Sequence, residues 1–241
     1  MNADQEMPGD GLKWLALEAS AREASLAILA GGQVLQAEQW TLGARTGADF
    51  FPRLDALLAA AGCSFAEIGA LAVGRGPGRY AGLRLALTLA QSLALPDDRP
   101  VHAVDSALAL ARQVAAEQQV DRVLVAGDAR RDSLWLQLFD LGAQPDPAPV
   151  AWTPCPVAEL PAWVAAADCC VSPDWTRLQA AGLTIPAARW LPGDASPHAA
   201  WIGKLAWERQ RVGRPPEPLN AIYIHPAVAS QGTDTHSQPT T

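Results

Sequence analysis

Hydrophobic residues along this chain follow two spacings: alternate positions in some stretches, and every third or fourth position in others. Three alternating stretches come first, separated by the turns AREA and GG: KWLALEAS, SLAILAG and QVLQAEQWTL. We expect three strands here. Residues 47–62 change to helical spacing, and their apolar side chains share one face: Phe50, Phe51, Leu54, Leu57, Leu58 and Ala61.

Single strands and helices alternate after this first helix. The apolar run IGALAVG predicts a strand, and a glycine-rich turn and a helix over 80–95 follow it. VHAV predicts another short strand, after which Asp105 is a good N-cap for the helix DSALALARQVAAEQQ. The first half of the chain therefore has the order βββαβαβα.

The same order begins again near residue 121. The segment DRVLVAGDARRDSLWLQLFDL predicts strand, turn and strand, and PAPVAWT is a candidate third strand. We expect helices at VAELPAWVAAAD, DWTRLQAAG and SPHAAWIGKLAWERQRVG, the last capped by Ser196, and strands at CCVS, AARWL and AIYIH. A weak internal repeat supports a duplication, because the strands WLALE and LVAGD end on Glu18 and Asp128 and each leads into a tight turn.

These alternations predict an α/β fold with two helix-covered sheets facing each other. The turns bearing Glu18 and Asp128 would point into the cleft between the sheets. We expect one lobe at 12–105 and a second at 106–195, with 196–226 packing back on the first. Residues 1–11 and 227–241 are polar and are expected to be loose tails.

Composition, charge and the absence of common motifs exclude several classes of function. The 241 residues are 49% hydrophobic with a net charge of −7, so binding nucleic acid unaided is not expected. The N-terminus lacks the features of a secretory signal, no run of 18 apolar residues occurs, and the four cysteines form no CxxC pair, which together favour a cytoplasmic protein. HExxH, HxxxH and GxSxG are absent, so the common zinc-peptidase and hydrolase sites are not expected.

The segment VGRGPGRYAGLRLALTLAQSLAL carries the most specific pattern in the chain. It matches neither GxxxxGK[ST] nor GxGxxG, although backbone N–H groups at the helix start could still attract an anion. Small residues recur every four positions in the helix, a spacing that lets another helix pack closely: Gly78, Gly82, Ala86, Ala90 and Ala94. Two interpretations stay open here, a helix sandwiched inside its own domain or an interface for another subunit.

GRGPGRYAGLR after IGALAV, followed by LALTLAQSLAL, resembles the GRGPGSFTGLR segment of the TsaB family. LALEAS resembles the family's opening strand, which usually ends Asp-Thr-Ser. GDARRDSLWLQLF is similar to its Asp-Ala-Arg stretch, and AIYIH to its closing Tyr-Leu-Arg. The resemblance covers about residues 12–226.

The resemblance implies the two-lobed actin/Hsp70-like (ASKHA, ribonuclease H-like) fold and a non-catalytic role in forming threonylcarbamoyladenosine on tRNA beside the anticodon. It implies that the chain binds the related protein TsaD, which carries the metal and nucleotide chemistry, that the ATPase TsaE joins them, and that tRNA is contacted only through the complex. Family members pair through two helices, corresponding to residues 47–61 and 80–95, and alone form homodimers. The partner-binding residues implied here are Phe50, Phe51, Leu54, Leu58, Gly78, Tyr80, Gly82, Leu83, Ala86, Leu87, Ala90 and Gln91.

The chain departs from the family pattern at several polar positions. Asp-Thr-Ser is replaced by Glu18-Ala19-Ser20, and Ser-Phe-Thr by Arg79-Tyr80-Ala81. The His-Ser/Thr before the first helix is Thr46-Gly47, and the closing Arg is His225. These losses count against nucleotide binding, so we expect no metal and no cofactor beyond weak ATP or ADP binding at a vestigial cleft formed by Glu18, Ser20, Asp128 and Arg130.

Two alternatives to the scaffold remain. A carboxylate pair such as Glu18 and Asp128 holds a metal–nucleotide complex in active members of this fold, so a kinase or nucleotide hydrolase is one alternative. A homodimeric binding protein without a further partner is the other. For Glu18 and Asp128, capping of solvated turns is the simpler explanation.

Overall fold

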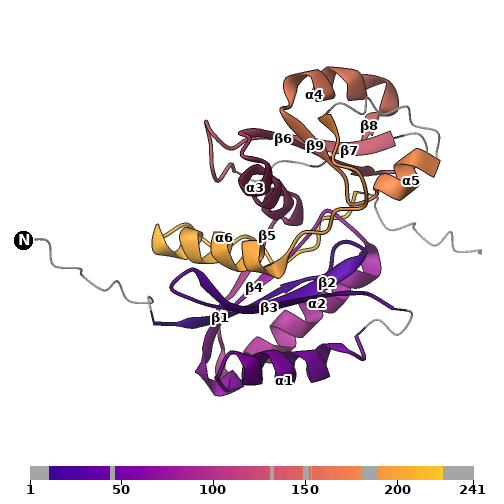
Figure 1. Ribbon diagram of the computed structural model, residues 1–241. Coiled ribbons are helices and arrows are strands. Elements are labelled where there is room, and N and C mark those ends of the chain that lie inside the picture. The colour runs from indigo at the N-terminus through magenta and orange to yellow at the C-terminus, as the bar shows by residue number, and fades with distance from the viewer. Residues whose placement is uncertain are drawn as a thin grey trace, which may run out of the picture.

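The computed structural model describes residues 11–43, 47–130, 133–148, 152, 154–180 and 189–224. A five-stranded sheet and a four-stranded sheet lie one above the other, with helices between and outside them (Figure 1). The larger sheet has the order β3-β2-β1-β4-β5. Its strands are β1 (Lys13–Glu18), β2 (Glu23–Ala30), β3 (Gln33–Thr41), β4 (Ile68–Gly74) and β5 (Val101–Val104).

The smaller sheet repeats the pairing of the larger one. Its order is β8-β7-β6-β9, formed by β6 (Arg122–Asp128), β7 (Ser133–Asp140), β8 (Pro154–Pro156) and β9 (Cys169–Val171). In each sheet the first strand pairs antiparallel with the second and parallel with the strand after the next helix. The predicted duplicated α/β architecture with two sheets is therefore confirmed.

The helices form three layers around these sheets. Helices α1 (Phe50–Ala60) and α2 (Tyr80–Ala94) cover the outer face of the larger sheet, and α6 (Ala199–Arg211) covers its other face (Figure 1). Helix α3 (Ser106–Gln118) lies between α6 and the smaller sheet, whose far face carries α4 (Leu160–Ala166) and α5 (Trp175–Ala180). Three short 3₁₀ helices are η1 (Phe65–Glu67), η2 (Leu95–Asp97) and η3 (Val157–Glu159).

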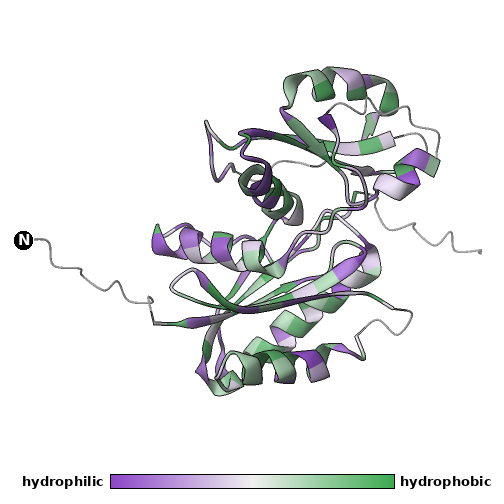
Figure 2. Ribbon diagram, in the orientation of Figure 1, coloured by the Kyte–Doolittle hydropathy of each residue, from purple (hydrophilic) through white to green (hydrophobic). Residues whose placement is uncertain are grey.

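Strand periodicity explains why both faces of each sheet are buried. On β1, Trp14 and Ala16 face α6 and the central core, whereas Leu15 and Leu17 face α1 and α2. The central core is dense because α6 approaches the sheet at Gly203, where a Cβ would lie 2.3 Å from the Leu29 side chain. Figure 2 shows that α1 carries mostly hydrophobic residues, whereas the C-terminal half of α6 is hydrophilic.

Several element boundaries differ from the expectations. The N-cap of α6 is His198, whose Nδ1 accepts a hydrogen bond from the Ala200 N–H, while the expected cap Ser196 accepts one from Glu23 N–H instead. Asp105 occupies the N-cap position of α3, but its carboxylate makes no capping hydrogen bond.

The last expected strand and two shorter ones also differ. Residues 221–224 form no strand, and within this segment Ile222 N–H donates a hydrogen bond to the Arg75 carbonyl at 2.7 Å. The third strand of the second half is Pro154–Pro156, whereas most of the expected PAPVAWT lies outside the described residues. In AARWL, Trp190 forms an isolated bridge to Cys170. The departures at Thr46 and His225 and nearly all of both tails also lie outside the described residues.

None of the described helices is both long and apolar enough to cross a membrane.

Candidate functional site: the glycine-rich turn and the helices beside it

Backbone N–H groups of the glycine-rich turn after β4 donate hydrogen bonds to other residues of the same chain. Arg75 N–H donates to the Val104 carbonyl at 2.9 Å, and Gly76 N–H donates to Ser106 Oγ at 3.0 Å. Arg79 N–H donates to the Ser20 carbonyl at 2.7 Å. An anion-binding nest needs free N–H groups that converge on the ligand. These three N–H groups already donate hydrogen bonds within the chain, so they are not available to bind an anion.

Glu18, at the end of β1, is buried beneath this turn with no exposed surface. Its Oε1 accepts a hydrogen bond from Ser20 N–H at 2.5 Å, and its Oε2 accepts one from the Ser106 hydroxyl at 2.7 Å. A Cβ on Gly74 would lie 1.7 Å from Oε2, so the carboxylate requires glycine there. Burial raises the pKa of Glu18, and the hydrogen bonds from Ser20 and Ser106 oppose that rise.

Asp128 occupies the corresponding place at the end of β6. Its Oδ1 accepts a hydrogen bond from Arg130 N–H at 2.7 Å, which repeats the geometry of Glu18 and Ser20. Its Oδ2 lies 3.2 Å from Arg177 Nη1, and its own N–H donates to Asp174. Arg130 adopts a positive φ of 59° in this turn.

The structure thus brings together Glu18 with Ser20, and Asp128 with Arg130, but each pair closes its own turn. The expectation that both carboxylates are solvated caps is wrong for Glu18, which caps its turn from inside the core. Within the described ranges, no three His, Cys, Asp or Glu side chains are placed to hold a metal ion.

The row of small residues on α2 lies against the chain's own sheet. Ala86 and Ala90 have no exposed surface, and Gly82 is buried against the Ala19 carbonyl, 1.9 Å from where a Cβ would stand. The expectation that this row admits a neighbouring protein is therefore corrected: its small side chains let α2 approach β1 and β4. Most of the expected partner-binding residues are buried in the same core, namely Phe50, Leu54, Leu58, Gly82, Leu83, Ala86, Leu87 and Ala90.

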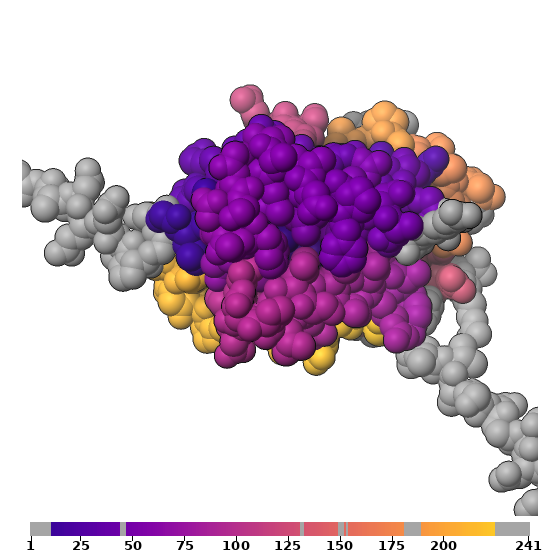
Figure 3. Space-filling view, turned by 90° about the horizontal axis from the view of Figure 1, so that it is seen from below, coloured from indigo at the N-terminus to yellow at the C-terminus, as the bar shows by residue number. Residues whose placement is uncertain are grey.

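The opposite side of α1 and α2 faces solvent, and we call it the α1–α2 outer face. It is formed by Phe51, Pro52, Asp55, Ala56, Ala59, Ala60, Tyr80, Ala81, Arg84, Leu85, Thr88, Leu89, Gln91, Ser92 and Leu93. Phe51 is 53% exposed, and Leu85, Leu89 and Leu93 form a half-buried stripe along α2. Figure 3 shows the two helices side by side on this surface. Of the expected residues, Phe51, Tyr80 and Gln91 lie on it, and Gly78 is exposed just before α2.

An aromatic cluster stands at the N-terminal end of α2. The rings of Tyr80 and Tyr223 are 5.1 Å apart, and both side chains are largely exposed. Arg84 Nη1 donates a hydrogen bond to the Tyr80 hydroxyl at 2.5 Å, and its guanidinium stands 5.3 Å from the centre of that ring. The hydrogen bond from Ile222 to Arg75 holds the C-terminal segment beside the turn, which places Tyr223 here.

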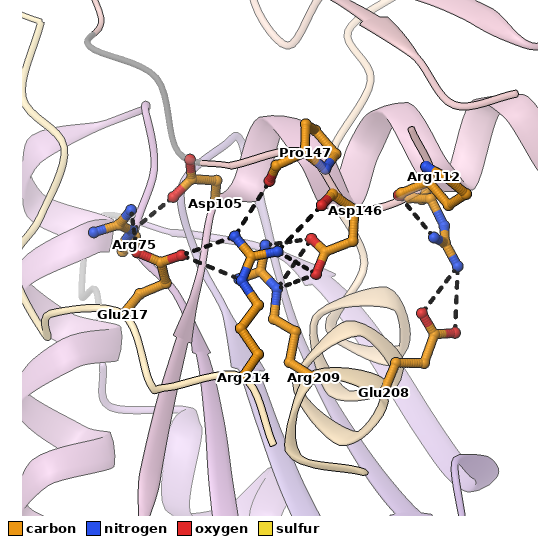
Figure 4. A network of polar contacts seen from close by, with 10 residues as sticks. Arg75, Asp105, Arg112, Asp146, Pro147, Glu208, Arg209, Arg214 and Glu217 are labelled. Carbon is orange, nitrogen blue, oxygen red and sulfur yellow. Dashed lines mark hydrogen bonds and ion pairs between the residues drawn. The ribbon is translucent and has the colours of Figure 1, made fainter. Parts of the chain in front are cut away.

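Sequence reasoning missed a network of ion pairs behind the glycine-rich turn (Figure 4). Arg75 Nε donates to Asp105 at 2.6 Å, and its Nη2 lies 3.4 Å from Glu217. Arg209 on α6 forms a bidentate pair with Asp146, which follows β7, and Arg214 joins Asp146 to Glu217. Burial raises the pKa of Asp105, and the charge of Arg75 opposes that rise. The only sequence signal was an arginine between two glycines of a tight turn.

Comparisons with known proteins find relatives whose names concern threonylcarbamoyladenosine in tRNA. A family model described as "TsaD: tRNA N6-adenosine threonylcarbamoyltransferase" matches residues 48–148. A Haemophilus influenzae relative, named "tRNA threonylcarbamoyladenosine biosynthesis protein TsaB", is 34% identical over 125 residues, 52% of each chain. An Escherichia coli (strain K12) relative of the same name is 36% identical over 84 residues, 35% of this chain and 36% of the relative. The chain is therefore similar to proteins of the TsaB family over about half of its length.

Solved structures extend this family likeness over the fold. A Pseudomonas aeruginosa protein, described as uncharacterized with similarity to peptidase YEAZ, superposes with a TM-score of 0.73 at 27% identity, over 89% of this chain and 100% of that one. "YeaZ from Pseudomonas aeruginosa" gives a TM-score of 0.64 at 24% identity, over 88% and 99% of the two chains, and shows the fold alone. The chain thus shares the fold of these two solved structures. Its matches to the curated relatives span about half of their length or less.

Proposed function

We propose that this protein is a non-catalytic subunit of the machinery that forms threonylcarbamoyladenosine in tRNA, and that it binds a TsaD-type protein through the α1–α2 outer face. The curated TsaB relatives support the pathway, and the match to the TsaD family model supports a partner of related fold. In this proposal a TsaE-type ATPase joins the pair, tRNA is contacted through the complex, and the chain works in the cytoplasm without a cofactor of its own.

The observation that carries the docking proposal is the composition of the α1–α2 outer face. Along α1 and α2 it exposes Phe51, alanines and the leucine stripe, with only Asp55 and Arg84 as exposed charges. Large contiguous patches of exposed apolar surface are typical of sites where another protein binds. Two adjacent helices also present a ridge-and-groove surface into which a partner's helices can pack.

The Glu18 site supports the non-catalytic part of the proposal. A nucleotide phosphate placed at the glycine-rich turn would meet a buried carboxyl and N–H groups that already donate to the chain. The Asp128 carboxylate is engaged by Arg130 and Arg177 in the same way. These contacts favour a structural role for both carboxylates over the kinase or hydrolase alternative.

Charge placed on the outer face tests the proposal. Phe51→Arg and Ala59→Arg put a cation on exposed positions of α1, so the monomer should stay folded while affinity for the TsaD-type protein of the same genome falls by about 100-fold or more. Size-exclusion chromatography with light scattering and titration calorimetry measure this, and also show whether the chain alone forms a homodimer.

Val212→Arg is the matched control, because Val212 is 74% exposed at the end of α6, the helix on the other face of the sheet. Its affinity should equal that of the wild type. If Phe51→Arg and Ala59→Arg both bind the partner as tightly as Val212→Arg does, the proposed docking surface is wrong.

A further inference from the structure

We propose that Tyr80, Arg84 and Tyr223, with Arg79 beside them, form an anchor at the N-terminal end of α2, at the edge of the α1–α2 outer face, and that this anchor binds carboxylate side chains on the docking surface of the protein partner. This inference rests on the proposed function and adds to it a residue-level basis for choosing the partner. We call these four residues the tyrosine–arginine anchor.

The anchor is preformed by contacts within the chain. The Tyr80 hydroxyl accepts a hydrogen bond from Arg84, and the Tyr80 ring packs against Tyr223. The backbone of Arg79 is held at the start of α2 by the hydrogen bond from its N–H to the Ser20 carbonyl. Side chains ordered before binding lose less conformational entropy on association, and tyrosine and arginine are the residues that most often dominate binding energy.

The two arginines of the anchor have no carboxylate partner among the described residues. Most of the described arginines lie against carboxylates, among them Arg53, Arg75, Arg99, Arg112, Arg122, Arg177, Arg209 and Arg214. Arg79, Arg84 and Arg22, which follows Ser20 by two residues, form no ion pair with any described residue, and the same holds for Arg130, Arg189 and Arg211, although the chain has a net charge of −7. Exposed cations left unpaired in an acidic protein are complementary to an acidic surface.

A second copy of this chain supplies too few carboxylates for this role. Helix α1 contains one acidic residue, Asp55, with Asp49 at its N-cap, and α2 contains none, so a copy docked through the same helices brings two carboxylates to three arginines. A partner with several carboxylates at the matching end of its docking helices would neutralise all three. The anchor therefore favours a heterologous partner over self-association.

Nucleic acid is a weaker match to the same residues. Binding of a phosphate backbone depends on many cations along a track. Here the cations gather at one end of α2, while the rest of the α1–α2 outer face is apolar and offers no further arginine or lysine along α2. The continuity of Tyr80 with that apolar face favours a protein.

Paired charge reversal tests the anchor. The double variant Arg79→Glu/Arg84→Glu should weaken binding to the purified TsaD-type protein by about 30-fold or more, and wild-type affinity should fall as salt is raised from about 50 to 500 mM. Tyr80→Phe and Tyr223→Ala, which leave the charge unchanged, should each weaken binding by about threefold to tenfold.

The matched control is Lys204→Glu/Arg211→Glu on α6, on the other face of the sheet, where each cation also stands over an aromatic ring, Trp201 or Trp207. It makes the same change in net charge and should leave affinity within about twofold of wild type. Thermal unfolding of every variant checks that the exposed substitutions leave the fold intact.

The outcomes separate the two proposals. If wild type binds the partner and Phe51→Arg abolishes binding, but the anchor variant binds like its control, the anchor is wrong and the proposed function stands. If wild type does not bind the partner at all, the proposed function fails. If wild type binds an anticodon stem-loop RNA, and the anchor variant loses that binding while keeping partner affinity, the anchor is a nucleic-acid site and the inference is overturned.

Discussion

Glu18 shows how one residue can have a different role from the one its sequence context suggests. It ends β1, and its side chain reaches under the glycine-rich turn to the Ser106 hydroxyl. The same hydroxyl accepts from Gly76 N–H, so the carboxyl joins the end of β1 to the turn and to the start of α3. Its environment is the fully buried interior, which disfavours the charged form.

The raised pKa of Glu18 predicts the sign of a pH effect on stability. The folded state holds this proton to higher pH than the unfolded state does, so the free energy of unfolding should fall as pH rises above the ordinary pKa of about 4.5 toward the folded value. Glu18→Gln should flatten that part of the curve. Urea unfolding between pH 4.5 and 7.5 measures the slope, with the exposed Glu117→Gln as the control. An unchanged slope in Glu18→Gln would show that another group causes the pH dependence.

At the scale of an element, α2 illustrates how two sides of one helix serve different surfaces. The small residues at every fourth position face β1 and β4, and the leucine stripe and polar residues face outward. The spacing alone predicts a close helix contact but does not distinguish a sheet of the same chain from another protein's helix. Only the position of the Ala19 carbonyl beside Gly82 decides between them.

Substitution of Gly82 by alanine separates helix propensity from packing. Alanine should stabilise a helix interior by about 1 kcal/mol relative to glycine. The added Cβ would stand 1.9 Å from the Ala19 carbonyl oxygen, a backbone atom that cannot move aside at low cost. The steric clash should outweigh the gain in helix propensity, so the free energy of unfolding should fall by about 1–3 kcal/mol. Chemical denaturation measures this, and Gly43→Ala, with open space around its Cβ, should change stability by less than about 0.5 kcal/mol. A Gly82→Ala protein as stable as wild type would contradict the close approach.

At the scale of the whole molecule, helices packed between the two sheets join the two halves of the chain. Helix α6 comes from the end of the chain yet covers the first sheet, and α3 connects it to the second sheet. The ion-pair network of Figure 4 adds polar contacts between the same parts, since Asp146 follows β7, Arg209 lies on α6 and Arg75 lies in the glycine-rich turn. The network also holds the C-terminal segment that carries Tyr223 to the outer face.

Removal of one network partner should be costly because Arg209 is 94% buried, with 6% of its surface exposed. Asp146→Ala leaves this guanidinium without its bidentate carboxylate, so stability should fall by about 3 kcal/mol. Asp168→Ala breaks the more exposed pair with Arg122 and should cost less than about 1 kcal/mol. The double variant Asp146→Ala/Arg209→Met should recover part of the loss in urea denaturation. Equal costs for Asp146→Ala and Asp168→Ala would contradict the importance of the network.

The sequence by itself determined the order of most elements, the duplication and the resemblance to TsaB proteins, because strand and helix periodicities and the glycine-rich segment are local properties of the chain. It also indicated the helices over 47–61 and 80–95 as partner-binding elements, which stays a prediction. It did not determine that the small-residue row faces inward, that Glu18 is buried, or that Arg75, Asp146, Arg209 and Glu217 meet.

Tertiary structure alone decided those points, because they depend on contacts between residues far apart in sequence. The inward or outward direction of the α2 faces is set by the sheet on which α2 packs, and the environment of Glu18 is set by Gly74 and Ser106, more than 50 residues away. Packing and burial, which are properties of the assembled core, select one of several faces that the same local pattern allows.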